Sequence, residues 1–221
     1  MKKTTGKRPA AKKGSVAKKA TRKRGISKAN VKRLFVAIEE DDPETLGDVL
    51  DAHPEALETV GEHNRLVRDK TPLMYALQNR NLPLAGHLLD RGADATAIMP
   101  GGPMSCVLSL AVKFAYSDPD LFPNWIPFVE RLLDEGADPT DGLWTSVARH
   151  GDNGNTRLDL IRLLLDRGGN PDRRPNLVSP TATQSTIRTL VKINRAKHPP
   201  ELLAMFDIEP DDEMASDAEN E

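Results

Sequence analysis

The chain has 221 residues, a formal net charge of −2 and a single cysteine, Cys106. One cysteine excludes an intrachain disulfide framework and indicates a reducing compartment. No apolar run reaches the roughly 20 residues that a membrane-spanning helix needs, so we expect an intracellular protein, cytoplasmic in a bacterial host and open to nuclear import in a eukaryotic one.

The charges are distributed unevenly along the chain. Of the 31 Lys and Arg, 14 lie in residues 1–33, which hold no acid, whereas the remaining 17 stand against all 33 Asp and Glu and give the rest of the chain a net charge of −16. Residues 1–29 cannot bury enough apolar surface to offset the entropy of ordering, so we expect a disordered basic tail. We expect residues 207–221 to form a disordered acidic tail.

The basic tail is a candidate for polyanion binding. A flexible segment of closely spaced Lys and Arg displaces the counterions of DNA or RNA and binds without sequence preference. Its clusters resemble the Lys/Ala-rich tails of histone-like proteins and a bipartite nuclear-localisation signal. A solvated tail that folds back on the acidic body is the third alternative. The candidate contact residues are Lys7, Arg8, Lys12, Lys13, Lys18, Lys19, Arg22, Lys23 and Arg24.

One phrase occurs three times in the rest of the sequence. Leu-Leu-Asp-x-Gly, followed by Ala-Asp or Gly-Asn, occupies residues 88–94, 132–138 and 164–170, and a divergent copy stands at 49–54. The phrase predicts the last turn of a helix that ends at a glycine in the left-handed conformation. Recurrence every few tens of residues indicates stacked repeats rather than one closed core.

Each copy of the phrase follows a short apolar stretch that ends in alanine. The alanines, spaced by 39, 35 and 37 residues, are Ala37, Ala76, Ala111 and Ala148. We expect each to lie where two helices cross closely and only a small side chain fits. The stretch Thr-Pro-Leu-Met-Tyr-Ala at 71–76, together with its glycine phrase, resembles the ankyrin repeat. In the turn between the two helices of this unit, Arg80 and Asn81 replace the usual Gly-His pair.

The resemblance covers roughly residues 30–172. It implies an all-α fold, an ankyrin-type solenoid of about four to five stacked helix pairs between the two tails. The expected domain is 30–206, with units at 30–65, 66–99, 100–140 and 141–174 and a degenerate closing pair at 175–206.

The third unit has nine residues more than the second between its alanine and its glycine. They fall within 115–125, a segment with three aromatic residues in a chain that is only 4% aromatic. Insertions in repeat proteins often lie on the binding face, and Trp and Tyr are favoured interface anchors. The alternative is that these rings pack on the neighbouring repeat. With Trp144 on the first helix of the fourth unit, the candidate partner contacts are Tyr116, Leu121, Phe122, Trp125 and Trp144.

Nothing in the sequence indicates catalysis. The five histidines have no metal-ligand spacing, and Cys106 is expected as a buried, inert thiol inside a helical repeat. We therefore expect no enzyme, no cofactor, no metal and a monomer. The function hypothesis is an adaptor that binds a protein partner through its loops, its groove and the aromatic insert, with nonspecific polyanion contact by the tail. The alternative is a nucleic-acid-associated or DNA-mimicking regulator whose charged elements are the primary binding surfaces.

Overall fold

The computed structural model describes residues 25–99, 106–117, 122–149, 157–175 and 185–210. The expected polyanion contacts, from Lys7 to Arg24, lie outside these residues, as does Leu121. The side chain of Phe122 also lies outside the description.

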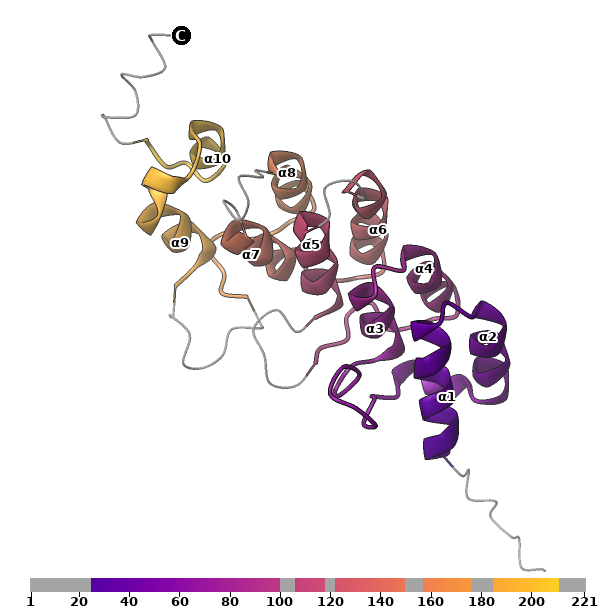
Figure 1. Ribbon diagram of the computed structural model, residues 1–221. Coiled ribbons are helices and arrows are strands. Elements are labelled where there is room, and N and C mark those ends of the chain that lie inside the picture. Colours follow the sequence, from indigo (N-terminus) through magenta and orange to yellow (C-terminus); the bar gives the residue numbers. More distant parts are fainter. Residues whose placement is uncertain (1–24, 100–105, 118–121, 150–156, 176–184, 211–221) are drawn as a thin grey trace, which may run out of the picture.

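The described residues form an all-α solenoid of five helix pairs (Figure 1). The first helices of the pairs lie side by side in one layer and the second helices in another. The first layer contains α1 (Lys28–Glu39), α3 (Pro72–Gln78), α5 (Val107–Ser117), α7 (Pro139–Arg149) and α9 (Ile187–Ile193). The second layer contains α2 (Pro43–Ala52), α4 (Leu82–Asp90), α6 (Phe122–Asp134), α8 (Leu158–Asp166) and α10 (Pro200–Met205). The expected fold class is therefore confirmed.

Side chains before the second pair fix where its helices begin. The hydroxyl of Thr71 accepts a hydrogen bond from the N–H of Met74 at 3.4 Å, and Pro72 occupies the first helical position. Asn81 Oδ1 accepts from the N–H of Leu84 at 2.9 Å. Each cap satisfies an amide that the first turn of a helix leaves without a partner, so α3 and α4 begin where the repeat phrase predicts.

Three glycines end their helices in the left-handed conformation, as the repeated phrase predicts. The φ angles are 88° at Gly92, 97° at Gly136 and 92° at Gly168. At the first of these, the N–H of Gly92 bonds the carbonyl of Leu89, and the N–H of Ala93 bonds that of Leu88. This pair of bonds is a Schellman motif, which closes the last carbonyls of α4.

The divergent copy at 49–54 ends its helix in a different way. His53 has a φ of −141°, and Pro54 then starts a short 3-10 helix, η1 (Pro54–Glu58). The physical reason is that a histidine pays a steric cost at positive φ that a glycine avoids. The first pair therefore lacks the glycine-based turn of the next three.

The crossing position holds an alanine in the first three pairs but not in the fourth. Ala37, Ala76 and Ala111 are buried, whereas Ala148 is exposed. The reason is that α7 starts at Pro139, only four residues after α6 ends. Gly142 takes the close contact instead, since a Cβ there would lie 2.9 Å from Leu164 Cδ2. The expectation for Ala148 was wrong.

Ion pairs between consecutive second-layer helix ends repeat along the stack. The aspartate of one glycine phrase pairs with an arginine of the next unit: Asp51 with Arg91, Asp90 with Arg131, and Asp134 with Arg167. These three pairs, which we call the Asp–Arg ladder, have N–O distances of 2.5, 2.8 and 2.6 Å. The ladder places one polar contact at each of the first three junctions.

Candidate protein-interaction surfaces

The aromatic insert of the third pair is core rather than surface. Trp125 is 0% exposed and Tyr116 is 3% exposed, so a partner cannot contact either ring in this structure. Trp125 lies 6.3 Å from both Phe114 and Phe128, ring centre to ring centre. Trp125 and Tyr116 as partner contacts are thus corrected, and of the two alternatives the packed one is found. The rings pack within their own helix pair rather than on a neighbouring repeat.

The additional residues of this pair mostly lengthen its helices. Helix α5 has 11 residues and α6 has 13, against 7 in α3 and 9 in α4. A longer helix pair needs more apolar contact along its extra turns, and the aromatic rings provide it. Burial raises the pKa of Tyr116 to about 12, so its phenol stays protonated. Trp144 on α7 is partly buried against the same core.

The loop before α3 presents apolar side chains to solvent. We call residues 59–71 the first finger loop. The N–H of Gly61 bonds the carbonyl of Lys70 and the N–H of Asp69 bonds that of Gly61, both at 3.0 Å, so the loop is closed at its base. At its tip, Asn64 Oδ1 accepts from the amides of Leu66 and Val67.

These bonds hold one apolar residue of the first finger loop inside and two outside. Val67 is buried, whereas Leu66 is 55% exposed and Val60 is 41% exposed. The sequence analysis did not single out either residue, although consecutive Leu and Val in a polar segment were a visible signal.

The loop before α5 repeats this arrangement. We call residues 91–106 the second finger loop, of which 91–99 and 106 are described. Asp94 accepts hydrogen bonds from the amide and hydroxyl of Thr96, and the N–H of Asp94 bonds Glu58 of the first pair. Ile98, 57% exposed, bridges to Cys106 at the loop's base. Burial raises the pKa of the Cys106 thiol, which is consistent with an inert side chain.

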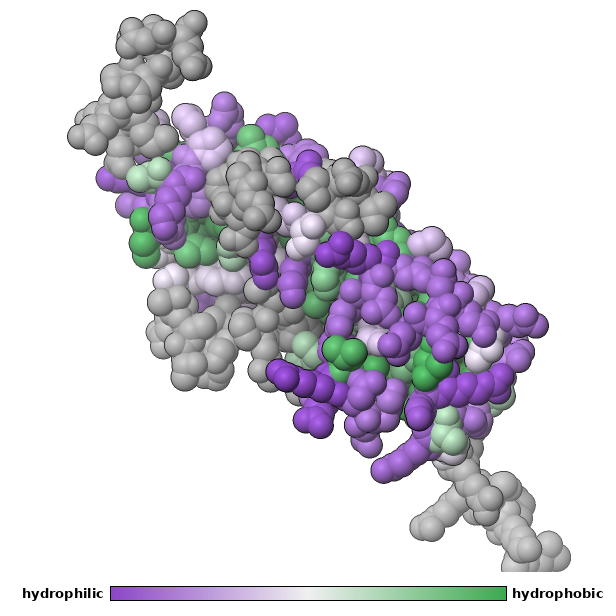
Figure 2. All heavy atoms as spheres, viewed as in Figure 1, coloured by the Kyte–Doolittle hydropathy of each residue, from purple (hydrophilic) through white to green (hydrophobic). Residues whose placement is uncertain are grey.

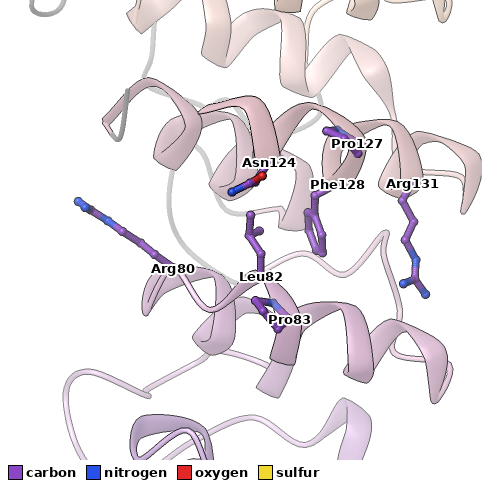
Figure 3. A pocket seen from close by; sticks show the side chains of 7 residues that line it. All are labelled: Arg80, Leu82, Pro83, Asn124, Pro127, Phe128 and Arg131. Carbon is purple, nitrogen blue, oxygen red and sulfur yellow. The ribbon is translucent and has the colours of Figure 1, made fainter. Parts of the chain in front are cut away.

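A pocket of about 550 Å³ lies between α4 and α6 (Figure 3). Leu82 and Pro83 line it from α4, and Pro127 and Phe128 line it from α6. The remaining lining residues are Arg80, Asn124 and Arg131. The pocket belongs to the second helix layer, whereas the finger loops precede first-layer helices.

The surface in Figure 2 is mostly hydrophilic, with hydrophobic residues in small separate patches. In the described part of the chain, no three His, Cys, Asp or Glu side chains come together in a way that could hold a metal ion. No helix there has both the length and the apolar character to cross a membrane.

Residues 68–99, which run from the end of the first finger loop through α3 and α4, match the family model of the ankyrin repeat. The chain is an ankyrin-repeat protein. No curated protein matches its sequence. Ankyrin repeats are protein-interaction modules, and this ankyrin-repeat stack has the helix pairs, glycine turns and projecting loops of such a module.

Proposed function

We propose that this ankyrin-repeat protein is an adaptor that holds a protein partner against its two finger loops. The observation that carries the proposal is the exposure of Val60, Leu66 and Ile98. Together with Ile193 on α9, they are the large hydrophobic residues that remain exposed in the described part of the chain. Three of these four lie on the two loops.

The surroundings of these residues support a binding role. Glu62, His63 and Arg65 are exposed beside them on the first finger loop. Apolar side chains inside a polar rim are the usual composition of a protein interface. Removing apolar surface from water gains about 25 cal/mol per Å², so a partner that covers these side chains is favoured.

The experiment is affinity capture with the full-length chain, followed by quantitative mass spectrometry. Leu66→Glu and Ile98→Glu place a charge where the partner's apolar surface would lie, so both should deplete the same captured proteins. Ile193→Glu is the matched control, since Ile193 is 71% exposed and lies on the last pair. Capture that is equal for all three variants would contradict the proposal.

We also propose that the basic tail adds a nonspecific polyanion contact. The supporting observation is the segregation of 14 Lys and Arg into residues 1–33 without one acid. Binding to random-sequence DNA should weaken steeply with salt, by a slope of about −0.9 per neutralised phosphate. Replacing the nine candidate residues between Lys7 and Arg24 by Gln in the full-length chain should flatten that slope, and an unchanged slope would refute the tail as the contact.

The charged-regulator alternative makes the opposite prediction for the captured proteins. If the charged elements are the primary binding surfaces, the Gln-substituted tail should lose the captured partners while Leu66→Glu retains them. The adaptor proposal expects the reverse.

A further inference from the structure

We propose that the pocket between α4 and α6 is a second docking site. Its occupant is a short acidic segment of a protein partner, with one large apolar side chain in the pocket and carboxylates at the two arginines. The inference rests on the proposed function only in taking the ligand to be a protein.

The floor of the pocket is shaped for an apolar side chain. Figure 3 shows Leu82 from α4 and Phe128 from α6 pointing toward each other, with Pro83 and Pro127 beside them. Phe128 is almost fully buried, whereas Pro83 and Pro127 are exposed. An apolar side chain that enters between them removes exposed apolar surface on both helices, and this removal supplies the driving force.

The charges at the pocket select an acidic ligand. Two of the seven lining residues are arginines and none is acidic, although the chain outside residues 1–33 has a net charge of −16. Arg80 stands at one end of the pocket and Arg131 at the other (Figure 3). Guanidinium groups recognise carboxylates with paired, charge-assisted hydrogen bonds.

Arg131 is held in place before any ligand arrives. Its Nε donates to Glu135 at 2.9 Å, its Nη2 to Asp90 at 2.8 Å and its Nη1 to the carbonyl of Gly86 at 3.3 Å. A guanidinium has five N–H groups, so a fixed Arg131 keeps donors for a ligand carboxylate. Because the two acids already balance its charge, Arg131 supplies directed hydrogen bonds, and the exposed Arg80 supplies attraction at the other end.

Two lining residues are kept in locally unfavourable positions. Arg80 has a φ of 57°, a left-handed conformation that costs a residue with a Cβ free energy, in a turn where the ankyrin repeat usually has glycine. Pro127 stands in the interior of α6, where it cannot donate to the carbonyl of Pro123. Residues that oppose local preference cluster at functional sites, and these two line one pocket.

The pocket and the finger loops can be occupied together. The pocket lies in the layer of second helices, and the finger loops lie against the first helices (Figure 1). A partner on the loops therefore leaves the pocket accessible, and the protein can join two different molecules.

The experiment selects ligands for the full-length protein from a display library of random 12-residue peptides. One enriched class should combine a large apolar residue with flanking Asp or Glu. A fluorescein-labelled synthetic copy of its most enriched member then serves as the probe in anisotropy titrations. Arg80→Gly and Pro127→Glu should each weaken its binding at least ~10-fold.

The two variants are chosen so that unfolding cannot imitate the result. Arg80→Gly relieves the left-handed strain and Pro127→Glu removes a helix-interior proline, so neither should lower the melting temperature. Leu66→Glu is the control and should leave the probe's affinity unchanged. Enriched peptides that are basic, or that ignore both pocket variants, would overturn the inference. If all of them respond to Leu66→Glu alone, the pocket proposal fails while the finger-loop proposal stands.

Discussion

Asp90, at the end of α4, accepts a hydrogen bond from Arg131 of α6, with 2.8 Å between Oδ1 and Nη2. The aspartate belongs to the glycine phrase of one repeat, and the arginine belongs to the next. The same relation joins Asp51 to Arg91 and Asp134 to Arg167. The repeated phrase thus ends each helix and also contributes a contact to the following unit.

The ladder predicts a small, measurable coupling between neighbouring units. A double-mutant cycle on Asp134→Ala and Arg167→Ala should give a coupling of about 0.5 kcal/mol, because both side chains remain partly in water. Urea unfolding at low and high salt measures it, and the coupling should shrink at high salt.

Asp166 provides the matched control for this cycle. It holds the same place in the last glycine phrase, yet it takes part in no ion pair within the described residues. Asp166→Ala should leave the free energy of unfolding nearly unchanged. A loss as large as that of Asp134→Ala would show that the aspartate acts within its own helix rather than between units.

Arg80→Gly should stabilise the protein. The left-handed conformation costs a residue with a Cβ roughly 1–2 kcal/mol, and part of the gain is offset by the greater freedom of glycine in the unfolded chain. We expect a net gain of about 1 kcal/mol in the free energy of unfolding, measured by urea titration.

Asp41, at the same turn of the first pair, tests the explanation for Arg80. It has a φ of 55° and also accepts a hydrogen bond from Asn81. Asp41→Gly should therefore gain less than Arg80→Gly. Destabilisation by Arg80→Gly would mean that the arginine's own contacts outweigh the backbone strain.

Trp125→Ala should destabilise the protein by about 3–5 kcal/mol, because the ring is fully buried between Phe114 and Phe128. Trp125→Phe should cost much less, since it retains a ring and removes an indole N–H that has no acceptor among the described residues. Thermal unfolding compares the two. Equal melting temperatures for Trp125→Ala and the unaltered protein would place the ring at the surface.

Asp138 should make stability depend on acid pH. Burial raises the pKa of Asp138, but hydrogen bonds from Arg173 and Thr140 outweigh burial, and the net pKa lies below the ordinary range. A group with a lowered folded-state pKa contributes stability above its unfolded pKa of about 4 and loses it as pH falls through the folded value. The urea midpoints of the unaltered protein and Asp138→Asn should converge below about pH 4. A constant difference down to pH 2 would contradict this assignment.

The sequence predicted the elements that depend on local chemistry. The glycine turns follow from the positive φ that glycine tolerates, and the start of α3 follows from the cap at Thr71 followed by Pro72. Both are decided within a few residues, so a short pattern is sufficient.

Properties that depend on neighbouring helices could not be read in this way. The burial of Trp125 requires that α5 and α6 lengthen together, which a count of inserted residues does not reveal. Ala148 fits the alanine pattern, but the early start of α7 moves it to the surface. The pocket and the ladder join residues about forty positions apart, and only the stacked structure brings them together.

The four-residue connection between α6 and α7 has a consequence for how the stack comes apart. The other first-layer helices from α3 onward follow connections of sixteen residues or more, so their pairs can separate by loosening a long loop. The third and fourth pairs have no such slack, and α5 packs directly on α7. In native-state hydrogen exchange, residues 107–117 and 139–149 should therefore open as one cooperative block, after the outer pairs have frayed.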